Sequence, residues 1–255
     1  MKIALVTLMD DGFMISYRGF WQSLIYHNPW FTWDFVVLDN GLSEENKREI
    51  KRNHKNTFIK KIDKKAYCDV KFKKTHPKLQ ATYYTFDAFA CGAYDRIVFM
   101  DMDITILGDI KDLFKCSYGF AACRAYNAKT DTLTDRFNSG VFVVQKEYLT
   151  NSVYRSLINI SKRGFSMPDQ RTLNSYFKDN VHWLPKKYNV EKRMMNTKNH
   201  TDIWDEKVCL HWVANKPWDK EKDNDIERSF VDLEKIWWKY YNMRGSYGTE
   251  MERSG

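Results

Sequence analysis

The sequence has few cysteines, few glycines and no long run of apolar residues. Its five cysteines are scattered and none forms a C-x-x-C pair, which disfavours a zinc knuckle and a redox dithiol. The first apolar segment is followed by Met9-Asp10-Asp11-Gly12 and not by a glycine-rich phosphate fingerprint, which disfavours a dinucleotide-binding unit and a P-loop. No stretch approaches the roughly 20 apolar residues of a membrane span. Scattered thiols and the missing span predict a cytoplasmic protein.

The formal net charge is +8, yet no arginine-rich arm or nucleic-acid-binding motif accompanies it. The lysines lie mostly in residues 47–78 and 186–198, where acidic residues are interleaved with them. This pattern predicts a solvated basic surface and no nucleic-acid partner. The alternative is a surface that attracts anionic substrates or anionic lipid, and the charge alone does not choose between the two.

Short apolar runs alternate with segments of helical periodicity, which predicts an α/β fold: a mostly parallel central sheet flanked by helices. With 43% hydrophobic residues and no visible linker, residues 1–244 are expected to form one domain, followed by a polar, frayed tail at 245–255. The expected strands are residues 2–8, 33–38, 57–62, 96–100, 119–123, 140–145, 181–184 and 208–211. The expected helices are residues 14–26, 43–53, 79–93, 153–163, 170–177 and 232–241, with Ser43 as the N-cap of the second.

A pair of carboxylates directly follows one strongly apolar segment. Residues 97–100 are all apolar, which predicts a strand buried on both faces, and Asp101 and Asp103 come next. In an extended chain, residues i and i+2 project to the same side, about 6–7 Å apart along the strand. Two such carboxylates repel each other and lose hydration unless a cation bridges them. A divalent ion that also binds diphosphate oxygens is the usual solution, and the carboxyl end of an α/β strand is where ligands are expected.

Two other interpretations fit the same residues. A pair of exposed turn aspartates produces this short pattern as well. Residues 101–105, Asp-Met-Asp-Ile-Thr, also fit the Asp-x-Asp-x-Thr of haloacid-dehalogenase-type phosphatases, whose first aspartate is a nucleophile. Those enzymes need further acids at the end of a later strand, whereas the acids of residues 223–225 follow no apolar segment. The phosphatase is therefore the weaker alternative.

A histidine and a lysine lie close together further along the chain. His211 ends an expected strand, and Lys216 follows five residues later. An imidazole is a metal ligand and a mobile ammonium neutralises phosphate, so both suit a metal–diphosphate site. A lone histidine of this kind is more often structural. Its combination with Asp101 and Asp103 favours the metal interpretation.

Taken in order, these segments and four others resemble the retaining glycosyltransferases of family eight, which include glycogenin and the bacterial lipo-oligosaccharide galactosyltransferases. The resemblance runs from residues 5–8 to Lys216-Pro217-Trp218. Each landmark is a weak pattern alone, and their shared order makes the match specific. The landmarks are the metal strand at 94–103, the segment after it at 107–114, a sugar-binding strand at 137–142, an Asp-Gln helix at 169–174, and a strand and loop at 184–189.

The resemblance implies a glycosyltransferase-A fold and a metal-dependent retaining glycosyltransferase. Such an enzyme moves a hexose, glucose or galactose, from a UDP-sugar to a glycan, lipid-linked or protein acceptor. It implies Mn²⁺ or Mg²⁺ held by Asp101, Asp103 and His211 together with the donor diphosphate, with Lys216 as a second cation. The other donor-binding residues that it implies are Leu8, Asp10, Asp11, Met102, Asn138, Ser139, Asp169 and Gln170. A sugar-nucleotide-binding protein of the same fold without transferase activity is the alternative.

Asp169 and Gln170 are the catalytic candidates that the resemblance implies. Retention needs either a covalent intermediate or attack on the same face of an oxocarbenium-like centre, and the family is generally interpreted as same-face. Gln170 then stabilises positive charge, because an amide is a poor nucleophile. Asp169 is either a charge stabiliser or an anchor for donor hydroxyls, and the sequence does not choose.

Three departures from the family pattern bear on the donor. The terminal motif is one residue shorter than usual and has Ala214 in place of glycine. Thr85 stands where many members carry a basic residue, for which His76 or Lys78 is a substitute, and Ser166 stands where many carry an aspartate. These changes predict altered donor choice more than lost activity, because the metal ligands are intact.

The acceptor side is less defined. No tyrosine occurs between residues 189 and 208, which favours a separate acceptor over self-glucosylation. Residues 230–241 mix aromatic residues with Lys235 and Lys239. We expect a last helix packed on the core, and the alternative is peripheral contact with a membrane surface.

Overall fold

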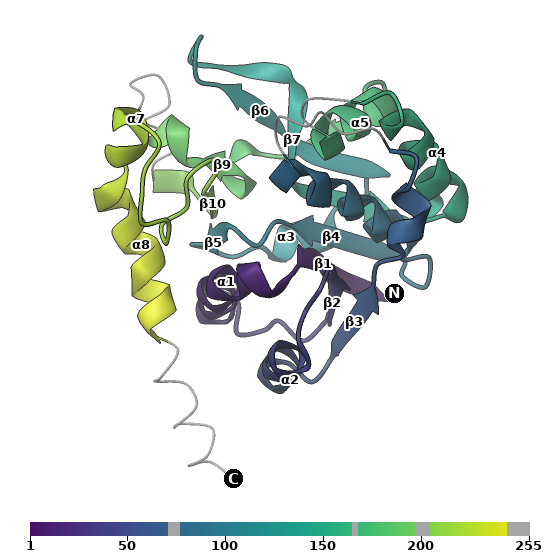
Figure 1. The fold of residues 1–255 in the computed structure, drawn as a ribbon, viewed down its shortest axis with the longest axis horizontal. Coiled ribbons are helices and arrows are strands. Elements are labelled where there is room, and N and C mark those ends of the chain that lie inside the picture. The colour runs from purple at the N-terminus through teal and green to yellow at the C-terminus, as the bar shows by residue number, and fades with distance from the viewer. Residues whose placement is uncertain (71–76, 165–167, 197–204, 244–255) are drawn as a thin grey trace.

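A seven-stranded sheet forms the centre of the structure, a computed structural model that describes residues 1–70, 77–164, 168–196 and 205–243 (Figure 1). The strand order is β3-β2-β1-β4-β7-β6-β8. Pairing is parallel except on the two sides of β7, so the prediction of a mostly parallel sheet is confirmed. The strands are β1 (Ile3–Met9), β2 (Asp34–Asp39), β3 (Thr57–Lys61), β4 (Arg96–Met100), β6 (Phe120–Asn127), β7 (Thr132–Gln145) and β8 (His182–Trp183).

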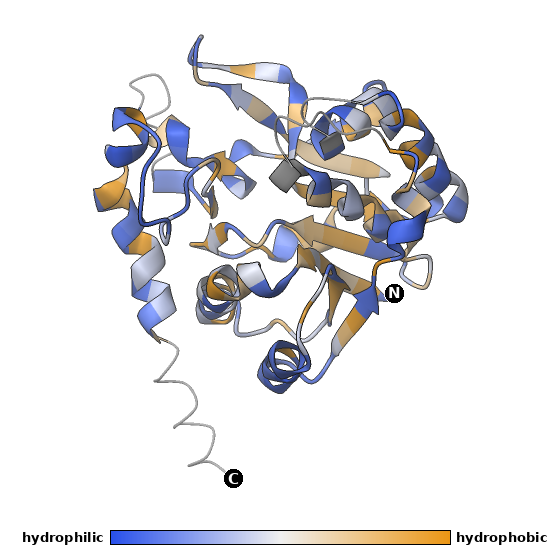
Figure 2. Ribbon diagram, in the orientation of Figure 1, coloured by the Kyte–Doolittle hydropathy of each residue, from blue (hydrophilic) through white to orange (hydrophobic). Residues whose placement is uncertain are grey.

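Alternate residues of the central strands enter two separate hydrophobic clusters, one on each face of the sheet. Leu5 and Val37 face one cluster, whereas their neighbours Val6 and Leu38 face the other. Helices α1 (Met14–His27), α2 (Glu44–Asn53) and α3 (Lys111–Lys115) contribute to the first cluster. The 3-10 helix η3 (Pro77–Ala90) with α4 (Asn151–Ser161) and α5 (Pro168–Phe177) contributes to the second. The sheet is thus buried on both faces, as Figure 2 shows by its apolar strands.

A second, three-stranded sheet lies beside the carboxyl end of the central one (Figure 1). Its order is β5-β10-β9, formed by Ile104–Ile106, Cys209–His211 and Val190–Glu191. β10 pairs antiparallel with β5 and parallel with β9. Because β5 follows β4 after three residues, this small sheet brings a late part of the chain to the end of the central sheet.

The last helix, α8 (Val231–Asn242), packs against the small sheet and against α1. Trp237 is fully buried, and a Cβ added to Gly19 of α1 would lie 2.5 Å from its indole nitrogen. Tyr240 completes the contact with a hydrogen bond to His27 at 2.7 Å. The prediction of a helix packed on the core is therefore confirmed. Within the described residues, no helix has the length and apolar character needed to cross a bilayer.

The predicted helices and strands are all found, most with ends shifted by one to three residues. Ser43 caps α2 as predicted, with its hydroxyl accepting from the Asn46 amide at 3.3 Å. The prediction of a strand at 140–145 was too short, because β7 begins at Thr132 and forms a hairpin with β6 that extends beyond the sheet (Figure 1). The predicted tail at 245–255 lies outside the described residues, as do His76 and Ser166. The remaining elements are η1 (Asp11–Phe13), η2 (Lys64–Tyr67), η4 (Lys146–Tyr148), η5 (Lys186–Tyr188), η6 (Lys192–Asn196) and α7 (Asp225–Arg228).

Candidate active site

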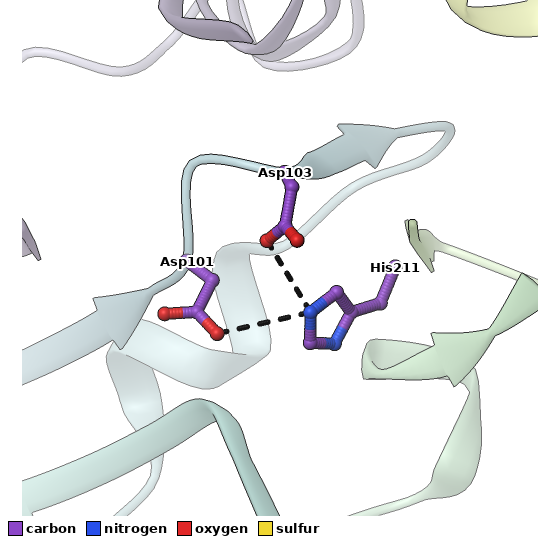
Figure 3. A group of neighbouring side chains, drawn as sticks. All are labelled: Asp101, Asp103 and His211. Carbon is purple, nitrogen blue, oxygen red and sulfur yellow. Dashed lines mark ion pairs between the residues drawn. The ribbon is translucent and has the colours of Figure 1, made fainter. Parts of the chain in front are cut away.

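Asp101 and Asp103 lie in the short turn that joins β4 to β5 (Figure 3). The prediction of an extended pair was wrong, because the chain turns immediately after Met100. The Asp101 amide donates to the Gly140 carbonyl at 2.8 Å, and the Ser16 hydroxyl of α1 donates to the Met102 carbonyl at 2.6 Å. The Met102 side chain is buried in the core.

His211 reaches these carboxylates from β10. The antiparallel register places His211 opposite Ile104, the residue after Asp103. Its Nε2 lies 3.3 Å from an Asp103 oxygen and 3.7 Å from an Asp101 oxygen (Figure 3). One atom from each of the three residues can be chosen so that all lie within 4.8 Å of one another. The predicted metal ligands are therefore brought together from two distant parts of the chain.

Two asparagines fix the orientation of the His211 ring. Asn189 Oδ1 lies 2.9 Å from His211 Nδ1, while Asn189 Nδ2 donates to Asn138 Oδ1 at 2.9 Å. Because that amide presents its oxygen to the ring, Nδ1 donates to it, and in the neutral ring the lone pair is on Nε2, the nitrogen nearer the carboxylates. This is the tautomer that a metal-ligating histidine needs.

Gly140 makes room for the ring. A Cβ added at this position would lie 2.4 Å from His211 Cε1 and 2.7 Å from Nδ1, closer than any real contact allows. The Gly140 amide also donates to Asn138 Oδ1 at 2.9 Å. Sequence motifs pointed to the segment 137–142 but not to the steric role of Gly140, and they passed over the role of Asn189 within the 184–189 landmark.

The charges of the cluster are strongly coupled. Burial and the neighbouring Asp103 carboxylate raise the pKa of Asp101 to about 7, against the opposing influence of His211. Burial also opposes ionisation of Asp103, but the Lys216 ammonium and His211 hold its pKa well below the ordinary value. For His211, burial lowers the pKa, and Asp103 more than reverses this. Two carboxylates and one imidazole with a directed lone pair form a donor set that suits a divalent ion such as Mn²⁺.

Asp169, at the start of α5, lies beside this cluster. Its carboxylate accepts a hydrogen bond of 2.6 Å from Ser139 on β7, and its charge helps to raise the pKa of Asp101. Burial raises the pKa of Asp169 itself, against hydrogen bonds from Ser139 and Thr82. Asn174 ties α5 to β7 through both the amide and the carbonyl of Phe137, each at 2.9 Å. Gln170, which follows Asp169 in the chain, is thereby held at the same edge of the sheet as Asp169.

Lys216 lies in the loop that follows β10. Its ammonium contacts the Asp103 carboxylate and donates to the Trp212 carbonyl at 2.7 Å. Ala214 in this loop has a φ of +61°, the left-handed region that glycine adopts more readily, and glycine is the residue expected there from the family pattern. Thr85, at the place of the expected basic residue, is buried.

The end of β1 contributes the remaining candidates. β1 runs parallel to β4 with Val6 opposite Phe99, so Leu8 lies toward the same end of the sheet as Asp101. Asp10 caps the turn that follows and accepts from Asn40 at 3.2 Å. Asp11 accepts from the Ser43 amide and from Asn46, so it ties this turn to α2. Contacts within the described residues do not join Asp10 or Asp11 to the cluster of Asp101, Asp103 and His211.

The fold is of the glycosyltransferase-A type, with two carboxylates and an imidazole gathered beside the carboxyl end of its central sheet. The chain belongs to glycosyl transferase family 8, whose model matches residues 4–222. The family identified from the order of the sequence motifs is thereby confirmed.

Proteins with similar sequences occur in both a bacterium and a plant. Glycosyltransferase GlyF of Streptococcus pneumoniae is 25% identical over 263 residues, covering 95% of this chain and 62% of GlyF. Inositol phosphorylceramide glucuronosyltransferase 1 of Arabidopsis thaliana is 32% identical over 182 residues, covering 70% of this chain and 30% of that protein. The chain therefore spans less than two thirds of either relative.

Among solved structures, the galactosyltransferase LgtC in complex with donor and acceptor sugar analogs has the same fold. It superposes with a TM-score of 0.68 at 17% identity, over 91% of this chain and 95% of LgtC. At this level of identity the likeness shows the fold alone.

Proposed function

We propose that the protein is a metal-dependent retaining hexosyltransferase that uses a UDP-sugar, with glucose or galactose as the transferred hexose. The observation that carries this proposal is the convergence of Asp101, Asp103 and His211 beside the Ser139–Asp169 pair. Family membership supports glycosyl transfer. The geometry adds two carboxylates and an imidazole in one cluster, next to a partly buried carboxylate that can bind hydroxyl groups.

Asp101, Asp103 and His211 would hold Mn²⁺ or Mg²⁺, which when bound stabilises the charge that builds on the departing UDP. Lys216 would supply a second cation to the diphosphate once its ammonium group leaves Asp103. Asn138 uses its oxygen for the Gly140 and Asn189 amides, and its Nδ2 has no partner within the described residues. That nitrogen would donate to a donor-sugar hydroxyl.

The catalytic pair is proposed to act on the sugar ring. Asp169 is held in one orientation by Ser139, which suits an acceptor for sugar hydroxyls. Gln170 would present its amide oxygen to the positive charge at the anomeric carbon, and Leu8, Asp10, Asp11 and the Met102 main chain would meet the base and ribose. The acceptor would be a glycan, a glycolipid or a protein. LgtC in complex with donor and acceptor sugar analogs is a precedent, in the same fold, for binding a donor and an acceptor.

The phosphatase interpretation finds no support in the structure. Asn224 caps the short helix α7, and its neighbours Asp223 and Asp225 do not follow a strand. A chain that binds sugar nucleotides without transfer stays the second candidate, because Ala214 departs from the family pattern at a strained position.

A screen of UDP-sugars with Mn²⁺, reading UDP release, tests the proposal. Release with UDP-glucose or UDP-galactose is expected, and NMR of the product should show the donor's anomeric configuration retained. An inverted product would contradict the retaining mechanism. UDP binding without release from any donor or acceptor would favour the second candidate.

A further inference from the structure

Two lysines donate hydrogen bonds to main-chain carbonyls of the Lys216 loop (residues 212–218). Lys192 Nζ donates to the Asn215 carbonyl at 2.5 Å, and Lys222 Nζ donates to the Lys216 carbonyl at 2.6 Å. Asp219 accepts from the Lys216 amide at 2.6 Å. The backbone of Lys216 is therefore fixed on both its amide and its carbonyl side.

Both ammonium groups are largely removed from water and paired with acids of the C-terminal helices. The Lys192 side chain is fully buried and lies 2.5 Å from Glu227 of α7. The Lys222 side chain is 11% exposed and lies 2.8 Å from Glu234 of α8. A buried ion pair is weak evidence for stability, because apolar residues of similar volume often serve as well. The arrangement therefore calls for a role other than holding the fold together.

The loop itself supplies a reason for outside anchors. Ala214 adopts a φ of +61°. This conformation has a raised backbone energy for any residue with a Cβ and persists only where the surroundings impose it. Two residues later, the Lys216 ammonium contacts the metal ligand Asp103. A strained loop that carries a flexible side chain into a charged site needs its backbone held if that side chain is to stay in place.

We propose that Lys192 and Lys222 are positioning residues for the donor diphosphate. They act through the main chain of Asn215 and Lys216 and so place the Lys216 ammonium beside the metal carboxylates. The C-terminal helices α7 and α8 then belong to the donor site, because Glu227 and Glu234 orient the two lysines. This inference rests on the proposed function, since it takes a nucleoside diphosphate as the ligand.

A double-mutant cycle tests whether Lys222 acts through Lys216. UDP is titrated calorimetrically, with Mn²⁺ present, into the wild type, Lys222→Met, Lys216→Ala and the double variant. Lys222→Met is expected to weaken UDP binding about tenfold, as loss of a supporting contact typically does. In the Lys216→Ala background the same change should have no further effect. Losses that multiply in the double variant would overturn the inference.

Two further variants separate positioning from general stability. Lys222→Arg keeps a charged donor and should restore most of the affinity. Lys235→Met removes another lysine near this end of the chain, one paired at 2.7 Å with exposed Asp232, and should bind UDP as the wild type does. Equal weakening in Lys222→Met and Lys235→Met would assign the effect to the helix and not to the loop.

A second readout needs no nucleotide and so distinguishes failure of this inference from failure of the proposed function. Hydrogen–deuterium exchange of the peptide spanning residues 212–218 should be faster in Lys222→Met than in the wild type. The apolar pair Lys222→Met with Glu234→Leu covers the case in which the single variant unfolds, and it should show the same faster exchange. Unchanged exchange in a folded variant would overturn the inference. A wild type that binds no UDP would instead contradict the proposed function.

Discussion

Gly140→Ala should disable the metal site with little change elsewhere. The added Cβ would lie 2.4 Å from His211 Cε1, about 1 Å short of the 3.4 Å at which ordinary contact begins. Metal–ligand distances tolerate shifts of only about 0.2 Å. The ring cannot simply slide away, because Asn189 holds its Nδ1 at 2.9 Å. A displacement of this size would therefore carry Nε2 out of ligating range.

The expected magnitude follows from these distances. We expect Mn²⁺ affinity to fall by at least the roughly 10–100-fold that disturbing a ligand's support produces. Forcing one extra methyl into a packed site should also lower the free energy of unfolding by about 1–3 kcal/mol. Calorimetric titration of Mn²⁺ into the purified protein, with a thermal melt in parallel, measures both effects.

Gly108→Ala is the matched control. The nearest atom to a Cβ at Gly108 is a Val208 methyl at 3.4 Å, an ordinary contact, so this variant should bind Mn²⁺ as the wild type does. If Gly140→Ala binds Mn²⁺ with wild-type affinity, the assignment of His211 as a ligand is refuted. If both variants lose affinity equally, the effect belongs to loss of glycine flexibility and not to the site.

Three other predictions concern the same edge of the sheet. Asn189→Leu should weaken Mn²⁺ binding about 10–100-fold, because His211 loses the acceptor that sets its tautomer; unchanged affinity would exclude that role. As pH is raised toward 7, Mn²⁺ affinity should increase by up to about tenfold per pH unit. The reason is that the metal displaces the proton of Asp101, whose pKa is raised to about 7 by burial and Asp103. Ala214→Gly should raise the free energy of unfolding by up to about 1 kcal/mol, since glycine accepts the φ of +61° without strain, and a loss of stability in a denaturant titration would contradict this.

Much of the fold follows from local patterns. The apolar segment before Asp101 predicted a buried strand, and all five residues of β4 are buried. Ser43 was recognisable as a helix cap because a serine directly before a helical segment can accept a hydrogen bond from a free amide of the first turn. Such features are encoded within a few neighbouring residues, and the sequence therefore predicts them well.

The small sheet could not be predicted in the same way. β5 and β9 have three and two residues, too few to show any periodicity, and they are strands only because β10 pairs with both. The hairpin of β6 and β7 was missed for a related reason. Its outer residues are polar and exposed, so the alternation that marks a half-buried strand is absent there.

The three clustered side chains of the site were predicted from the sequence, whereas the residues that support them were not. Asp101, Asp103 and His211 carry chemistry that a sequence displays, whereas Asn189 and Gly140 matter through contacts made only in the folded chain. The contact of Lys216 with Asp103 was likewise invisible, because it depends on the course of a loop. Ala214 is the exception: its substitution for glycine was visible, and its left-handed backbone explains the family's preference.

The central claim is that the cluster of Asp101, Asp103 and His211 serves metal-dependent transfer from a UDP-sugar. The most direct measurement is UDP release from the best donor, with Mn²⁺, by the wild type and by Asp103→Ala, each checked for an unchanged circular dichroism spectrum. We expect release by the wild type that a chelator abolishes, and none above background by Asp103→Ala. Release by folded Asp103→Ala at near the wild-type rate would contradict the claim.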